Sequence, residues 1–220
     1  MLYGLIVGDD RNIQFDTNRQ PLEVWKHEYA NSWTAVLSAG CGQGYRSGLS
    51  CSCLIAGVGV KPNTSTFVSS DAWYLYQSGT DTIEYFIGSP DSGSVPLPAW
   101  GLVTYDAAGN VIFNSNARYV KIRQIIDVNR STLINGSSVD ISHNGIENPY
   151  YIIPINRGVT AYHLGTGFGL CFKMIGVKKI SATSAKIGWF VIYGTTAVSG
   201  SPPTSCFSVP DPFRVAVCTL

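Results

Sequence analysis

The sequence predicts an all-β protein with two tandem β-sandwich-like units that are related by internal duplication. Three observations predict this fold: short β-branched and aromatic runs between turn residues, a low content of charge, and a hairpin-like pattern that occurs twice. The chain has 220 residues, including 23 glycines and 11 prolines that suit many tight turns. We expect an N-terminal unit at residues 1–90 and a C-terminal unit, ending in a strand, at residues 99–220.

Short apolar runs dominate the chain, and no long segment repeats apolar residues at the helical period of 3.6. The segment 23–30 fits a strand and a short helical turn equally well. The C-terminal run is so apolar that we expect it to dock on a core or on a neighbouring subunit. The runs that we expect to form strands are 5–7, 33–37, 73–76, 83–87, 150–153, 170–175, 188–193 and 213–218.

Composition excludes several classes of function. Charged residues make up 13% of the chain, against about 25% in an average protein, and the net charge is +1. No basic run provides the electrostatic footprint that nucleic-acid binding requires. No apolar run approaches the roughly 18 residues of a membrane span, and residues 1–10 lack the basic start of a signal peptide. We therefore expect neither nucleic-acid binding nor membrane insertion, and synthesis in the cytosol.

An internal repeat is the most informative feature. Residues 3–24 and 100–122 share, in the same order, an aromatic-Gly pair, branched apolar residues, Asp, Asn, Phe and Asn, with one residue of slip inside a turn. Asp, Asn and Gly in those turns favour a hairpin, with the phenylalanine on the return strand. The anchors of the repeat are Tyr3, Gly4, Phe15, Trp100, Gly101 and Phe113.

A weaker echo pairs residues 83–87, Ile-Glu-Tyr-Phe-Ile, with residues 187–191, Ile-Gly-Trp-Phe-Val. It predicts that each unit begins and ends with matching strands. Between the units, residues 88–98 are rich in Pro, Gly and Ser and are typical of a linker.

Residues 100–122, which read Trp-Gly-Leu-Val-Thr-Tyr-Asp-Ala-Ala-Gly-Asn-Val-Ile-Phe-Asn-Ser-Asn-Ala-Arg-Tyr-Val-Lys-Ile, resemble a pattern in small virion proteins of tailed bacteriophages. Those proteins are encoded near tail-tip and tail-fibre genes and repeat the hairpin once. The resemblance covers the two repeats, under a quarter of the chain, and its motif carries over no catalytic residue. It implies a structural component of the phage tail, at the tail tip or a fibre attachment point, made in the host cytoplasm without a signal peptide.

The resemblance also implies partners. Strand edges and aromatic patches bind neighbouring chains, so we expect contacts with other phage tail proteins and a homo-oligomer, with a trimer favoured by the family context. The alternative is a host receptor-binding or lectin-like module that binds surface glycan through exposed aromatic side chains. The candidates for such contacts are Tyr29, Trp33, Tyr45 and Trp73.

Enzyme and metal patterns are weak, and we expect no catalytic residue, no cofactor and no metal. No Gly-x-Ser-x-Gly motif is present, and we interpret Asp81 and Glu84 as exposed loop carboxylates, not as an opposed catalytic pair. His27 with Cys41, Cys51 and Cys53 lacks the Cys-x-x-Cys spacing of structural zinc. The six cysteines are irregularly spaced, which favours free thiols in a cytosolic chain.

Overall fold

A computed structural model describes residues 22–36, 42–49, 57–71, 73–89, 100–105, 108–109, 111–134, 137–163, 167–195 and 206–220. Within these ranges the chain is nearly all β, as predicted. The elements are β1 (Glu23–Ala30), β2 (Thr34–Val36), β3 (Gly44–Gly48), β4 (Gly57–Lys61), β5 (Val68–Ser70), β6 (Tyr74–Gln77), β7 (Ile83–Ser89), β8 (Val103–Tyr105), β9 (Val111–Asn114), β10 (Lys121–Val128), α1 (Arg130–Ile134), β11 (Val139–Ser142), β12 (Tyr150–Ile152), β13 (Arg157–His163), β14 (Phe168–Ser181), β15 (Ser184–Gly194), β16 (Cys206–Ser208) and β17 (Phe213–Thr219).

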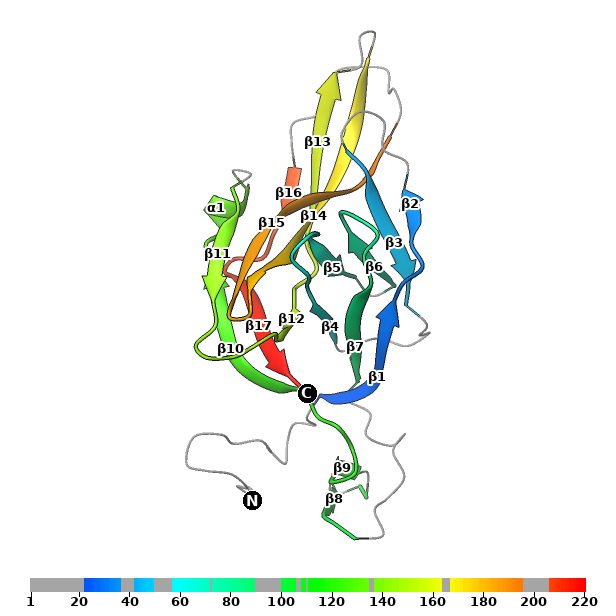
Figure 1. Cartoon of the computed structure of the whole chain (residues 1–220), viewed down its shortest axis with the longest axis vertical. Helices are drawn as coiled ribbons and strands as arrows, with labels where there is room; N and C mark the ends of the chain where they lie inside the picture. Colours follow the sequence, from blue (N-terminus) through cyan, green and yellow to red (C-terminus); the bar gives the residue numbers. More distant parts are fainter. Residues whose placement is uncertain are drawn as a thin grey trace.

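The first sheet has six strands in the order β1-β7-β4-β12-β17-β10 (Figure 1). Its first three strands come from the N-terminal part of the chain and its last three from the C-terminal part. The two sets join through antiparallel pairing of β4 with β12, where Val60 lies opposite Tyr151 and Gly59 opposite Ile152. Strands of residues 1–90 and of residues 99–220 therefore share one continuous sheet.

The two halves of this sheet have matching registers. β1 pairs with β7 from Glu23–Ser89 to Ala30–Ile83, with a bulge after the second residue pair. β10 pairs with β17 from Lys121–Thr219 to Val128–Phe213, with a bulge at the same step. The sheet thus has an approximate twofold arrangement, in which β1, β7 and β4 correspond to β10, β17 and β12.

The second sheet contains nine strands, seven of them in the order β11-β15-β14-β5-β6-β3-β2. β13 pairs with β14 and with β16 beside this path. This sheet also mixes the two parts of the chain, because Val68 of β5 lies opposite Val177 of the 14-residue strand β14. β14 and β15 pair with each other along most of their length.

The main hydrophobic core lies between the two sheets. Alternate residues of β7 and β17, such as Tyr85 and Val215, point inward and meet Leu75, Ile175 and Val177 of the second sheet. Period-two alternation explains this pattern, because successive side chains of a strand point to opposite faces. The strand β17 lies between β12 and β10, so the apolar C-terminal run docks on the core as expected.

A second hydrophobic cluster fills the space where the far end of β15 approaches β3. Met174, Phe190 and Ile192 are buried there together with Tyr76. Gly44 makes the close approach feasible, because a Cβ at this position would lie 2.5 Å from the carbonyl oxygen of Val191. This packing explains why β3 begins with a glycine.

Two equivalent loops are organised by asparagine side chains. Asn63, after β4, accepts hydrogen bonds through Oδ1 from the backbone N–H groups of Ser65 and Thr66. Asn156, after β12, is buried, and its side chain bonds both the N–H and the C=O of Ile175. Side-chain amides of this kind satisfy backbone groups that the strands leave open.

The hairpin β8–β9 forms a separate two-stranded sheet, below the six-stranded sheet in Figure 1. Phe113 stacks on Tyr119 with ring centroids 5.0 Å apart, and the Tyr119 hydroxyl donates to the Asn114 carbonyl and accepts from its N–H. The chain then reaches β10 beside β1, where Glu23 and Tyr119 form a β-bridge. The second copy of the repeat is thus a hairpin with its phenylalanine on the return strand, as predicted.

Several other predictions from the sequence can be compared with the structure. The first copy of the repeat, up to residue 21, and the run 5–7 lie outside the described residues. The segment 23–30 is a strand. The echo between residues 83–87 and 187–191 is wrong, because β7 and β15 lie in different sheets and β17 is the counterpart of β7. The short helix α1 was not expected, although Asn129 caps it by accepting from the Ser131 N–H.

Replacing Gly59 by alanine tests the packing of the first sheet. A Cβ at Gly59 would lie 2.0 Å from the ring of Phe86, which makes an edge-to-face contact with Tyr150 at 5.3 Å. We expect Gly59→Ala to lower the free energy of unfolding by about 1–3 kcal/mol, because the ring must leave its position. Gly48→Ala is the control, since a Cβ at that strand glycine meets nothing within 4 Å. Equal urea midpoints for both variants would contradict the proposed contact.

Candidate functional site

A shielded carboxylate lies on the outer face of the six-stranded sheet, where the two halves meet. Glu84 is the second residue of β7, and its side chain is 18% exposed. Its Oε2 accepts a hydrogen bond from Lys61 Nζ at 2.7 Å, and its Oε1 accepts one from the Tyr150 hydroxyl. His27 Nε2 lies 2.9 Å from both Glu84 Oε1 and the Tyr150 hydroxyl oxygen. These four residues are called the Glu84 cluster below.

Strand register brings the cluster together. Its members come from four neighbouring strands, β1, β7, β4 and β12. Glu84 lies directly opposite Lys61 on β4, and His27 lies opposite Phe86, the next outward residue of β7. Residues that lie opposite each other share a face of the sheet, so all four side chains point away from the core.

The cluster holds Glu84 ionised at neutral pH. Partial burial alone raises the pKa of Glu84, but hydrogen bonds from Lys61, Tyr150 and His27 and the charge of Lys61 outweigh it and lower the pKa below its usual value. Burial raises the pKa of Tyr150, and the hydrogen bond to Glu84 and its charge raise it further. A neutral phenol therefore donates to a charged carboxylate.

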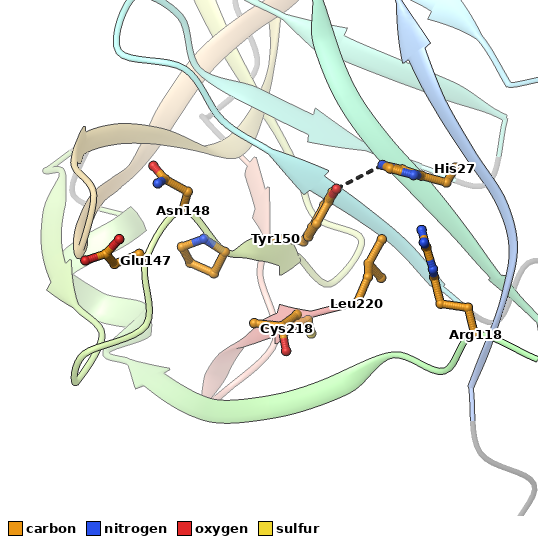
Figure 2. A pocket seen from close by; sticks show the side chains of 9 residues that line it. His27, Arg118, Glu147, Asn148, Tyr150, Cys218 and Leu220 are labelled. Atoms are coloured by element: carbon orange, nitrogen blue, oxygen red, sulfur yellow. Dashed lines mark hydrogen bonds between the residues drawn. The ribbon is translucent and has the colours of Figure 1, made fainter. Parts of the chain in front are cut away.

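A pocket of about 330 Å³ opens beside the Glu84 cluster. Figure 2 shows His27 and Arg118 on one side of it and Glu147 and Asn148 on the other, with Tyr150 between them. One wall is thus basic and the other offers oxygen acceptors. Such a convergence of polar groups on a small hollow is typical of ligand sites.

The floor of the pocket is apolar and unreactive. Cys218 lies there with no exposed surface, and Leu220 and Pro149 also line the pocket. Burial raises the pKa of the Cys218 thiol to about 12, so the thiol stays protonated at neutral pH. A buried, protonated thiol acts as a small hydrophobic group and not as a nucleophile.

Backbone contacts hold the rim of the pocket in place. Asn148 adopts a left-handed conformation with φ of 48°, which asparagine tolerates better than most residues. Its N–H donates to the Ala182 carbonyl at 2.8 Å, and its Oδ1 accepts from Lys179 Nζ at 2.5 Å. On the opposite side, the carbonyl of Arg118 accepts from the Val24 N–H at 2.7 Å.

The equivalent positions of the other half of the sheet have different chemistry. Arg214 of β17 occupies the place of Glu84, and Ile125 of β10 occupies the place of His27. Arg214 Nε donates to Asp127 Oδ1 at 3.0 Å in an exposed pair. Ile122 and Ile125, at 54% and 61% exposure, leave this part of the outer face apolar.

A second polar cluster supports the turn between β5 and β6. Asp71 is buried, and its Oδ1 accepts from the N–H groups of Trp73 and Tyr74, both at 2.8 Å. Its Oδ2 accepts from the Tyr76 hydroxyl at 3.0 Å and from Arg157 at 3.3 Å. The turn is therefore firmly held, and it presents Trp73 at 60% exposure.

The four aromatic candidates for glycan contact do not all lie in the same sheet. Tyr29 is exposed on β1 in the six-stranded sheet, whereas Tyr45 lies on β3 in the other sheet. Trp33 packs partly buried against the main core, and its Nε1 donates to the Asp81 carbonyl at 3.0 Å. Trp73 therefore has the geometry of a surface contact residue, and Trp33 has that of a structural one.

The residues that were predicted to anchor the repeat differ in their exposure and packing. Trp100 is 94% exposed at the start of the projecting hairpin, and Gly101 has a positive φ of 146°. Phe113 packs on Tyr119, as described above. Tyr3, Gly4 and Phe15 lie outside the described residues.

The interpretation of Glu84 as an exposed loop carboxylate is wrong. The residue lies within a strand, and three donors surround it because the neighbouring strands fold beside it. Asp81 does lie in a loop, where its Oδ2 accepts from Asn63. The sequence signal for Glu84 was its place in an alternating run, where it is the polar residue between inward-facing Ile83 and Tyr85.

Histidine and cysteine side chains have local roles in the described parts of the chain. His27 belongs to the Glu84 cluster, and His143 is buried, with Nε2 hydrogen-bonded to the Tyr151 hydroxyl. Burial lowers the pKa of His143. Cys171, Cys206 and Cys218 are not joined in disulfides within the described residues, and Cys41, Cys51 and Cys53 lie outside the described ranges. No three potential metal ligands gather among the residues that the structure describes.

Comparisons with protein-family models, curated proteins and solved structures found no match for this chain. Among the described residues, no helix has the length and apolar character needed to cross a membrane.

Replacing Glu84 by glutamine tests the cluster. The lowered pKa means that Glu84 stabilises the fold fully above its unfolded pKa of about 4.3 and loses this contribution as pH falls through the lower folded value. We expect Glu84→Gln to reduce the free energy of unfolding by about 1–2 kcal/mol at pH 7, with the difference from wild type shrinking in acid.

Asp127→Asn is the matched control for that experiment, because it breaks the exposed ion pair at the equivalent place of the other half. We expect its effect to stay below about 0.5 kcal/mol. Urea denaturation between pH 3 and pH 7 measures both variants. A pH-independent difference between wild type and Glu84→Gln would contradict the account.

Proposed function

We propose that this chain is a structural component of a bacteriophage tail that acts by assembly with neighbouring protein subunits. The observation that carries the proposal is the projecting hairpin β8–β9. It presents Trp100, Leu102 and Tyr105 to solvent, all large apolar or aromatic residues with high exposure. The same residues belong to the sequence pattern that resembles phage tail-tip and tail-fibre proteins.

The physical argument rests on exposed apolar surface. A two-stranded hairpin is marginally stable by itself, and large exposed aromatic residues are enriched at binding surfaces. The strand β10 offers a second surface on the same molecule. It is an edge strand of the six-stranded sheet, and Ile122 and Ile125 extend from its outer face. Edge strands with apolar side chains are ready-made sites for pairing with another chain.

We propose that the hairpin of one copy packs on the β10 edge of the next copy. Two different surfaces then meet, and this head-to-tail geometry closes into a ring or continues as a filament. A ring suits a tail tip, and the family context favours a trimer. The mechanism is passive: association removes apolar surface from water and fixes the position of the next tail component.

Replacing Trp100 by alanine tests the assembly proposal. Truncating a central aromatic contact costs about 2 kcal/mol or more, which weakens self-association roughly thirtyfold. Sedimentation velocity across a concentration series measures the effect. Trp73→Ala is the matched control, because it removes another exposed tryptophan from a different surface. Wild-type protein that stays monomeric, or equal association of wild type and Trp100→Ala, would contradict the proposal.

A host glycan-binding module remains the second candidate, and Trp73 is the observation that favours it. The residue is 60% exposed on a turn that Asp71 holds rigid, and Arg46 stacks on the neighbouring Tyr74 ring at 4.8 Å. Aromatic faces beside polar groups fit the alternating apolar and hydroxyl surfaces of a sugar.

The two candidate functions predict opposite behaviour for the two tryptophans. If the chain binds glycan at Trp73, we expect Trp73→Ala to abolish signals on a glycan array, because the stacking surface is lost, while Trp100→Ala retains them at matched oligomer size. Unchanged array signals for Trp73→Ala, or no signal for wild type, would exclude this second function.

A further inference from the structure

We propose that the pocket between Arg118 and Glu147 binds an acidic monosaccharide, with the Arg118 guanidinium holding the carboxylate of the sugar. This inference does not depend on the assembly proposal, because the pocket lies on the sheet face and not on the hairpin. It is carried by the size of the pocket, by the distribution of charge along its walls and by the rigidity of its rim.

The pocket has room for one sugar unit. Its volume of about 330 Å³ corresponds to roughly ten water molecules, at about 30 Å³ for each. The covalently bonded atoms of a hexuronic acid pack more closely than separate water molecules, so one such ring fits within this volume. The apolar side chain of Leu220, which lines the pocket and is partly exposed, suits the C–H face of such a ring.

Arg118 is the guanidinium group of the basic wall. Lys61 is committed to Glu84 at 2.7 Å. Arg118, in contrast, is exposed, and its guanidinium forms no ion pair with the residues that the structure describes. A guanidinium binds a carboxylate through two parallel hydrogen bonds, so Arg118 is the group on this wall that selects an acid.

The opposite wall selects hydroxyl groups. Glu147 is exposed there and Asn148 lies beside it, as Figure 2 shows. Because Lys179 occupies Asn148 Oδ1, the amide NH₂ of that residue is the group left for a ligand. A ligand with a carboxylate at one end and hydroxyl donors at the other matches both walls, and a simple carboxylate matches only one.

The rim is set before a ligand arrives. On one wall, Asn148 has a left-handed backbone conformation, and its N–H donates to the Ala182 carbonyl. On the other wall, the Val24 N–H donates to the Arg118 carbonyl. The Glu84 cluster fixes Tyr150 and His27 between them. Because the backbone of the rim is fixed, binding has to order only exposed side chains such as those of Arg118 and Glu147.

Two-dimensional NMR of the imidazole groups tests the proposal, because the chain has only three histidines and His27 lines the pocket. The probes are glucuronate, glucose and acetate, each titrated into the full chain. We expect glucuronate to shift the His27 signals saturably, with at least tenfold weaker binding of glucose and of acetate. We expect the buried His143 signals to stay unchanged.

Arg118→Gln provides the second arm, and we expect it to weaken glucuronate binding at least tenfold, the loss that follows from removing a charged hydrogen bond. Arg214→Gln is its control, because it removes the same charge from the outer face of the same sheet. Absence of a saturable shift with glucuronate would overturn the site. Equal binding of acetate or glucose would overturn the acidic-sugar assignment, and an equal loss in Arg214→Gln would overturn the role of Arg118.

Discussion

Pairing of β4 with β12 is the contact on which the rest of the structure depends. It joins the two halves of the six-stranded sheet with Val60 opposite Tyr151. This register directs Tyr151 into the core and Tyr150 to the outer face. A slip of one residue would exchange the two faces and bring Lys61 into the core, at a large cost in desolvation. Both the core and the Glu84 cluster follow from this single register.

The strand pairs β1–β7 and β10–β17 have the same backbone register but carry different side chains. The bulge occurs at the same step in each pair, so the backbone geometry is shared. In one half, the outer face carries a shielded carboxylate with three donors. In the other half it carries exposed isoleucines and an exposed ion pair. Equivalent backbones thus support a polar pocket on one side and an apolar edge on the other.

The two surfaces suit different partners for physical reasons. Apolar side chains on an edge strand and on a projecting hairpin gain free energy when another protein covers them. The pocket, in contrast, has polar walls that must be satisfied by water or by a polar ligand. Assembly and ligand binding are compatible in one molecule, because the hairpin β8–β9 and the pocket use different residues.

The sequence by itself determined the fold class and most strands, because alternation and turn residues are local properties. It also located the hairpin at residues 100–122 and the C-terminal strand. Strands rich in glycine or polar residues, such as β3 and β4, had weak local signals, and the helix α1 was too short for its period to show.

Only the tertiary structure decided which strands are neighbours and therefore which side chains meet. The four residues of the Glu84 cluster are separated by up to 123 positions in the chain, and no spacing in the sequence relates them. For the same reason the sequence similarity between residues 83–87 and 187–191 points to β15 as the counterpart of β7, although β17 occupies the equivalent place. Strand pairing is a non-local choice set by the packing of the whole core, so a local pattern predicts a strand but not its neighbours.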